Sequence, residues 1–185
     1  MSSRKKKKDS ASNSILSLSL YFLAVVGAAW LLNSFVITRD VVSGDSMYDT
    51  LNDKDVVMLD LISYRFSKPG RFDIVVFPAP DRKNSYMVKR IVGLPGETVR
   101  MDEEGNIFVN ERLINDSHAT EKVTDPGLAG GHGVVLGSDE YFVLGDNRNH
   151  SLDSRYENVR NVRKKMIKGR VFLRILPLNN FGKVK

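Results

Sequence analysis

The chain has 185 residues, a formal net charge of +6 and no cysteine. This length suits one folded domain with a short appendage, and the lack of cysteine excludes a disulfide framework and a thiolate zinc site. Residues 1–9 carry +4 of the charge, mainly through the run Arg4–Lys8. Because the basic excess is local, a basic face for nucleic acid on the folded domain is not expected.

The first element is an apolar stretch, residues 15–37, that contains no charged side chain. As a helix it would span about 35 Å, enough to cross a hydrocarbon core of ~30 Å. We therefore predict a transmembrane anchor at 15–37 that contacts membrane lipid. The positive-inside rule places the basic tail 1–14 in the cytoplasm and residues 38–185 on the outer side. The predicted location is the cell membrane, in a single-pass topology.

Other interpretations of this stretch are weaker. A cleaved secretory signal would use Ala28-Ala29 as its small-residue site, but apolar sequence continues beyond it. A core helix of a soluble domain is disfavoured, because such a helix normally has one polar face and no face of this stretch is polar. A nuclear-import or nucleic-acid tail at Arg4–Lys8 is disfavoured because an apolar span follows at once.

From residue 38 onward, short apolar runs alternate with Gly, Pro, Asn and Asp, which predicts a mainly β, antiparallel fold. Only residues 158–167 favour a short helix, and a polar, Gly-rich insertion lies near 100–140, with its least regular part at Leu113–Gly137. The predicted strands are Val56–Leu59, Ile74–Phe77, Met87–Val92, Ile107–Val109, Tyr141–Leu144 and Val171–Ile175.

The first segment with chemical potential is Ser43–Leu51, just after the apolar stretch. A serine on a glycine-containing turn, here Ser46 after Gly44, can project its hydroxyl toward neighbouring backbone N–H groups. An acyl-transfer site needs such a nucleophile beside an oxyanion hole. A Gly-Asp-Ser turn is, however, usually only a turn.

The second segment surrounds Lys89. Strand alternation places Met87, Lys89 and Ile91 on one face, so Lys89 has apolar neighbours on its own side. If that face is buried, desolvation lowers the lysine pKa and creates a general base without histidine. A pKa near 8 would leave roughly a tenth of the amine neutral at pH 7. The competing interpretation is an edge-strand lysine that discourages aggregation.

A metal centre is not predicted. The three histidines, His118, His132 and His150, are scattered, and none lies in an HExxH motif. No phosphate-cradling glycine loop is present either. We therefore expect neither a metal nor a cofactor.

Taken together, four ordered blocks resemble the signature boxes of bacterial type I signal peptidases, in the short form with one anchor typical of Gram-positive bacteria. The first is Ser46-Met47 followed by Thr50-Leu51, and the second is Phe72–Phe77. The third is Lys89–Glu97. The fourth is Gly145–Arg148 followed by Ser151, Asp153, Ser154 and Arg155.

The resemblance implies a β-rich catalytic core and a serine endopeptidase that removes signal peptides from secreted preproteins through an acyl-enzyme. It implies a preference for small side chains at the cleavage site. Ser46 would be the nucleophile, Lys89 the general base, Ser151 the residue that orients Lys89, and Gly44 a part of the oxyanion region. The residues expected to support the site are Asp146, Asn147, Asp153, Ser154 and Arg155.

Two positions depart from the family pattern. Asp49 stands where proline is usual, which leaves the turn after the nucleophile less restrained. Gly44 stands where some members have an oxyanion-hole serine, so backbone N–H groups, including that of Ser46, would carry most of the oxyanion stabilisation.

Two rival functions stay open at this stage. His150 and Asp153 could complete a Ser–His–Asp triad with Ser46. Alternatively, the chain could be an inactive paralogue or a tethered β-domain that only binds a partner.

Overall fold

The structure is a computed structural model that describes residues 16–31 and 36–184. The chain divides into two compact units, Met1–Thr38 and Arg39–Lys185. Each unit is described by itself.

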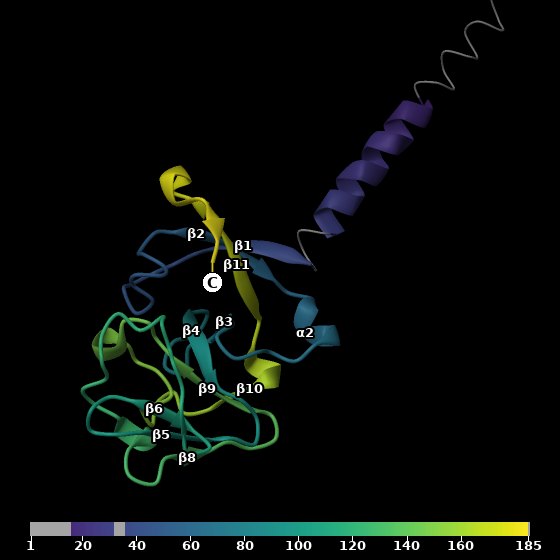
Figure 1. Ribbon diagram of the computed structural model, residues 1–185. Coiled ribbons are helices and arrows are strands. Elements are labelled where there is room, and N and C mark those ends of the chain that lie inside the picture. Colours follow the sequence, from purple (N-terminus) through teal and green to yellow (C-terminus); the bar gives the residue numbers. More distant parts are fainter. Residues whose placement is uncertain (1–15, 32–35, 185) are drawn as a thin grey trace, which may run out of the picture. The chain divides into compact units, whose positions relative to one another are not determined.

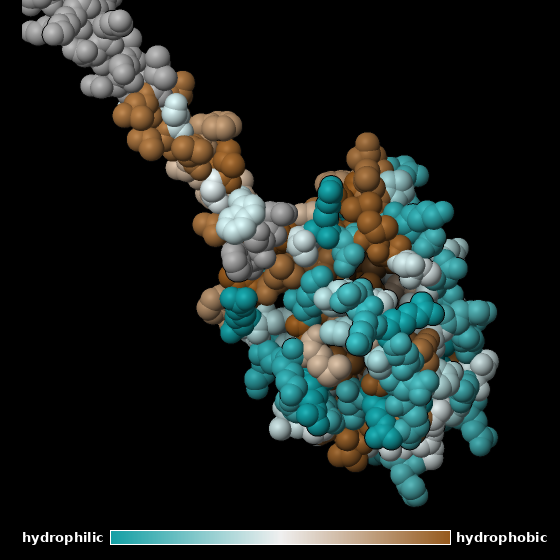
Figure 2. All heavy atoms as spheres, turned by 180° about the vertical axis from the view of Figure 1, so that it is seen from behind, coloured by the Kyte–Doolittle hydropathy of each residue, from teal (hydrophilic) through white to brown (hydrophobic). Residues whose placement is uncertain are grey.

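In the first unit, residues 16–31 form a helix. Its large apolar side chains, among them Leu18, Phe22 and Trp30, are exposed, and brown spheres cover much of it in Figure 2. Within residues 16–31 and 36–184, no helix combines the length and the apolar character needed to cross a membrane. The predicted basic tail 1–14, and residues 15 and 32–35 of the predicted anchor, lie outside the described residues.

The second unit contains two antiparallel sheets (Figure 1). Within the described residues, the larger sheet has eight strands in the order β1-β2-β11-β3-β4-β9-β10, and β12 pairs with β11. Every pairing whose register is resolved is antiparallel. Its strands are β1 (Ile37–Val41), β2 (Val56–Asp60), β3 (Ile74–Pro78), β4 (Tyr86–Gly93), β9 (Glu140–Leu144), β10 (Val162–Arg163), β11 (Gly169–Leu176) and β12 (Gly182–Lys183).

The smaller sheet has the order β7-β6-β5-β8 and falls within the predicted insertion. Its strands are β5 (Thr98–Met101), β6 (Ile107–Val109), β7 (Arg112–Leu113) and β8 (Val134–Val135). Short helical turns connect the strands of both sheets: α2 (Ser63–Phe66) and the 3₁₀ turns η1 (Gly127–Ala129), η2 (Arg148–His150), η3 (Lys164–Met166) and η4 (Leu178–Asn180).

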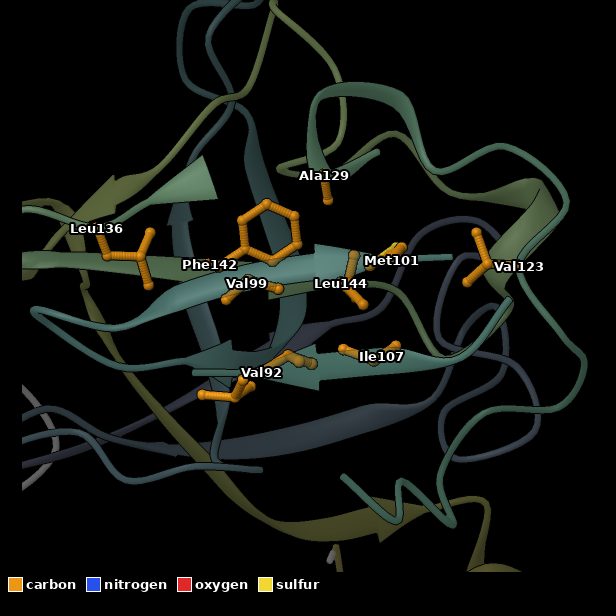
Figure 3. Packing of buried hydrophobic residues seen from close by; sticks show 10 residues of the cluster. Val92, Val99, Met101, Ile107, Val123, Ala129, Leu136, Phe142 and Leu144 are labelled. Carbon is orange, nitrogen blue, oxygen red and sulfur yellow. The ribbon is translucent and has the colours of Figure 1, made fainter. Parts of the chain in front are cut away.

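A hydrophobic cluster joins the smaller sheet to the larger one (Figure 3). Val99 and Ile107 of the small sheet pack with Phe142 and Leu144 of β9. The approach is close at Gly93, where a Cβ atom would lie 2.4 Å from Val99 Cγ2. A side chain at this position would push the sheets apart, so glycine is required by packing.

Strand β4 is the element that carries Lys89, and its register fixes where the lysine lies. Lys89 pairs with Val75 of β3, and Ile91 pairs with Val143 of β9. Val75, Ile91 and Val143 belong to one buried cluster, and Met87 packs against it. Met87 and Ile91, which are the predicted apolar neighbours of Lys89, are thus packed in the same cluster.

The mainly β, antiparallel fold class is confirmed, and each predicted strand overlaps an observed one. The predicted helix at 158–167 is wrong: this segment contains β10 and the turn η3. Val162 is 1% exposed and pairs with Tyr141 at the end of the large sheet. Tertiary pairing of one apolar residue therefore overrides a weak local helical preference.

Candidate active site

Ser46 lies on a loop that follows β1, and buried apolar residues that come after the serine hold this loop in place. Met47 and Leu51 are 1% and 0% exposed, and Leu51 N donates to Met47 O at 2.8 Å. Gly44 adopts a φ of +87°, a region that favours glycine, and open space surrounds it where a Cβ would stand. The chain therefore turns just before the serine.

The backbone amides near Ser46 differ in their availability to bind another group. Gly44 N donates to Asp53 Oδ1 at 2.9 Å, so this amide is engaged. In the part of the chain that the structure describes, no acceptor is found for the Ser46 N–H. Of the two, the Ser46 amide is the one free to meet an oxyanion.

Lys89 lies against the Ser46 hydroxyl. Its Nζ donates to Ser46 Oγ at 2.6 Å and to Val88 O at 3.2 Å. The residue is only 3% exposed. No carboxylate forms an ion pair with it among the described residues, so the ammonium has lost water without gaining a counter-ion in contact.

Burial lowers the pKa of Lys89 from 10.5 to about 8, because the charged amine is poorly solvated there. The more distant carboxylates of Asp153 and Asp146 raise this pKa, and the Arg155 guanidinium lowers it. Desolvation is the largest of these effects. About a tenth of the amine is then neutral at pH 7, which agrees with the value expected for a buried base.

Two buried ion pairs stand behind the lysine. Arg90 donates to both carboxylate oxygens of Asp146, at 2.8 and 2.7 Å, and both side chains are 0% exposed. Arg155 donates to both oxygens of Asp153, at 2.8 and 2.9 Å, again with both side chains fully buried. Bidentate pairing neutralises each carboxylate, which explains why neither binds the Lys89 ammonium directly.

Asn147 and Ser154 attach the surrounding loops. Asn147 N donates to Ser46 O at 3.2 Å, and its Nδ2 donates to Asp45 O at 3.1 Å. Ser154 Oγ accepts from Val143 N at 2.9 Å and donates to Arg160 O at 2.7 Å. The first residue therefore holds the nucleophile loop, whereas the second holds the final loop on β9.

Ser151 lies in the same buried region, but its hydroxyl is not used. It is 8% exposed, and its Oγ has no hydrogen-bond partner within the described residues. The hydrogen bond from Ser151 to Lys89 that the family resemblance implies is not formed in this structure. Gly145 backs this region closely, since a Cβ there would meet Ser151 Oγ at 2.2 Å and Ser46 O at 2.4 Å.

The alternative Ser–His–Asp triad is not assembled. The His150 side chain is 76% exposed, and its Nδ1 lies 3.2 Å from Asn147 Oδ1. Asp153 is fully committed to Arg155. The histidine therefore contacts neither of its supposed partners.

Sequence reasoning missed Arg90 as a supporting residue. A signal was available: a charged side chain within an otherwise apolar strand must find a buried partner. Its Nη1 also donates to Phe72 O at 2.8 Å, and its Nη2 lies 3.4 Å from Thr50 Oγ1. Arg90 thus ties together residues from all four sequence blocks.

A cavity of about 580 Å³ opens over the serine and the lysine. Its walls include Asp40 and Val41 of β1 with the following Val42, and Tyr86–Lys89 of β4, with apolar side chains from Val57 and Val76. No group of three or more His, Cys, Asp or Glu side chains able to hold a metal occurs in the described ranges. A hydroxyl held at a cavity by an amine whose pKa is lowered toward neutrality is the arrangement that a serine hydrolase with an amine base requires.

Comparisons with known proteins identify the family. A family model described as signal peptidase, peptidase S26, matches residues 15–176. A probable signal peptidase I-2 of Synechocystis sp. is 35% identical, over 96% of this chain and 81% of that protein. A signal peptidase I of Bacillus amyloliquefaciens is 32% identical, over 97% of this chain and 98% of that protein.

A crystal structure of a signal peptidase I from Enterococcus faecalis V583 superposes with a TM-score of 0.45 at 30% identity, over 56% of this chain and 97% of that chain. From the sequence relatives and the family match, the chain belongs to the signal peptidase family, peptidase S26. The resemblance inferred from the four blocks is confirmed, and the chain is a peptidase of this family.

Proposed function

We propose that the chain cleaves signal peptides from secreted preproteins by a Ser46–Lys89 dyad. The observation that carries the proposal is the 2.6 Å contact between Lys89 Nζ and Ser46 Oγ. The amine is buried, and residues 16–31 and 36–184 supply no carboxylate paired with it. The names of the relatives, signal peptidase I, support the substrate class.

In the first half-reaction, neutral Lys89 accepts the proton of Ser46 Oγ while that oxygen attacks the scissile carbonyl carbon. The carbonyl becomes an oxyanion, for which the Ser46 N–H is the proposed donor. The C–N bond then breaks, the leaving amine takes the proton from Lys89, and an ester on Ser46 remains. In the second half, water gives a proton to Lys89 and attacks the ester carbon. The bond from that carbon to Ser46 Oγ then breaks, and Lys89 returns the proton to Ser46 Oγ, which regenerates the hydroxyl and the neutral amine.

The cavity supports binding of an extended substrate. β1 ends the strand order of the large sheet, and β4 pairs with β9 only from Arg90 onward. Two strand edges, 40–41 and 86–88, therefore line one cavity. A substrate strand lying between them would gain main-chain hydrogen bonds, and alternate side chains would enter the cavity. The apolar walls at Val57, Val76 and Val88 favour small apolar side chains.

The proposal includes the anchor and the location. The uncharged stretch 15–37 and the exposed apolar side chains of helix 16–31 support a single-pass anchor in contact with membrane lipid. The run Arg4–Lys8 then remains cytoplasmic, and residues 38–185 work on the outer side, where signal peptides emerge. Cysteine labelling tests this topology: a cysteine added at Ser3 must be protected in intact cells, and one added at Lys183 must react.

The activity is tested by preprotein cleavage with the full chain in detergent or vesicles. We expect Ser46→Ala and Lys89→Ala each to lower kcat by at least about 10³-fold, since each removes a member of one catalytic unit. His150→Ala is the matched control and is expected to keep activity within about twofold. Full activity in either dyad variant would refute the dyad. A folded wild type that binds preproteins without cleaving them would instead indicate the inactive or purely binding alternative.

A further inference from the structure

A segment of the insertion runs alongside the residues that back the nucleophile. Residues 116–125, here named the strap, contain no helix or strand. Yet they contact residues 145–149, at the end of β9 and in η2, repeatedly. Thr120 donates to Asp146 O through both its N, at 3.1 Å, and its Oγ1, at 3.2 Å.

The polar groups of Asn149 form hydrogen bonds with the strap. Its Oδ1 accepts from Thr124 N at 2.9 Å and from Thr124 Oγ1 at 2.8 Å, and its Nδ2 donates to Lys122 O at 3.0 Å. Its backbone N donates to Glu121 Oε1 at 3.0 Å. A loop without regular structure is therefore held in one path by contacts to Asn149 of η2.

The buried link in this arrangement is Asp116 with Arg148. The two form an ion pair, and their side chains are 5% and 2% exposed. His118 supports the carboxylate, since its backbone N and ring Nδ1 each lie 3.1 Å from Asp116 Oδ1. Both partners are shielded from water, so the pair holds a defined geometry rather than the loose one of a surface pair.

Arg148 passes this constraint to the active site. Its Nε donates to Gly145 O at 2.9 Å, and its carbonyl accepts from Arg155 Nη2 at 2.5 Å. Gly145 leaves no room for a Cβ against Ser46 O and Ser151 Oγ. The Gly145 backbone therefore stands directly behind the nucleophile.

We propose that Asp116 is a positioning residue for the Ser46–Lys89 reaction: by orienting Arg148 it fixes the Gly145 backbone against which the nucleophile rests. The inference rests on the proposed function. It also gives the insertion a role in the reaction, beyond packing on the core. Displacing a reacting group by about 1 Å is enough to lower a rate by about 10²-fold.

The test is preprotein cleavage by the full chain carrying Asp116→Asn, which keeps the shape and removes the charge. We expect kcat to fall by about 10- to 100-fold while KM stays within about threefold, because substrate contacts lie elsewhere and only the alignment of the nucleophile changes. A purely structural residue would lower the amount of folded enzyme without changing kcat per folded molecule, so the folded fraction is measured by near-UV circular dichroism.

Four further variants sharpen the test. If Asp116 acts through Arg148, the double variant Asp116→Asn with Arg148→Met loses no more kcat than Arg148→Met alone. Glu111→Gln, which opens the more exposed Arg100–Glu111 ion pair within the same insertion, is the matched control and should keep kcat within about twofold. If Asp116→Asn does not accumulate as folded protein, Asn149→Ala releases the strap without stranding a buried charge, and the same fall in kcat is expected.

Wild-type kcat per folded molecule in Asp116→Asn, or in Asn149→Ala where that variant is used, would overturn the inference. Losses that multiply in the double variant would overturn it as well. Wild-type enzyme and Ser46→Ala run beside these variants: absence of cleavage by the wild type would count against the proposed function, whereas normal cleavage by wild type and Asp116→Asn alike would count against this inference alone.

Discussion

Lys89 and Arg90 are adjacent cations on β4, and the chain places them in opposite electrical surroundings. Both are buried, at 3% and 0% exposure. Arg90 has a carboxylate, Asp146, in bidentate contact, whereas the nearest polar partner of Lys89 is the Ser46 hydroxyl. Burial with a counter-ion makes Arg90 part of the framework. Burial without one lowers the pKa of Lys89 and suits it to act as a base.

The largest effect on stability should come from replacing Arg90, because this removes the counter-ion of the buried Asp146. Arg90→Met leaves Asp146 charged and buried without a partner, and we expect a loss of about 3–5 kcal/mol in the free energy of unfolding. Chemical unfolding of the full chain in mild detergent measures it. Adding Asp146→Leu should restore much of the stability, because the stranded charge is gone. A loss below about 1 kcal/mol would mean that the pair is not shielded from water.

Replacing Lys89 should have the opposite effect and raise the free energy of unfolding. Below pH 8 the folded chain holds a poorly solvated ammonium, and a shift from 10.5 to about 8 corresponds to about 3 kcal/mol. Lys89→Met should therefore be more stable than wild type at pH 7, by about 2–3 kcal/mol once the lost hydrogen bond is counted.

This advantage of Lys89→Met depends on pH. Between pH 8 and 10.5 the unfolded chain binds more of the lysine proton than the folded chain, so wild-type stability rises with pH there. The difference between variant and wild type should shrink over that window and nearly vanish above it. Unfolding curves at pH 7, 9 and 10.5 measure the difference, and a constant value would show that residue 89 is not desolvated.

The smallest expected effect is the pH dependence of the rate. Because the reactive form of Lys89 is neutral, kcat/KM should rise about tenfold per pH unit below about 8 and level off above it. Between pH 6 and 8 this gives roughly a 50-fold increase. Cleavage rates at low substrate concentration provide the profile. A midpoint near pH 10 would indicate an ordinary solvated lysine and break the contrast with Arg90.

The pattern of the chain was enough to predict several of these features. Runs such as Ile74–Phe77 and Tyr141–Leu144 are uniformly apolar and bounded by turn residues, so their strands could be recognised locally. β5 and β8 were missed because they are short and contain or adjoin polar residues. Residues 158–167 were assigned wrongly because their pairing with β9 is a long-range choice that no local preference reveals.

The residues of the predicted site also include features that the local sequence indicates and features that depend on long-range contacts. The order of residues along the chain is enough to show which groups are available: a serine on a turn, a lysine flanked by apolar residues, and carboxylates near guanidinium groups. The choice of partners depends on the folded chain, in which Arg90 pairs with Asp146, Arg155 pairs with Asp153, and the insertion holds Arg148 through Asp116. Those choices depend on which distant strands pair and on which side chains lose their water together. The lowered pKa of Lys89 follows from that shared burial. The sequence could therefore predict this pKa only on the condition that the fold buries the lysine.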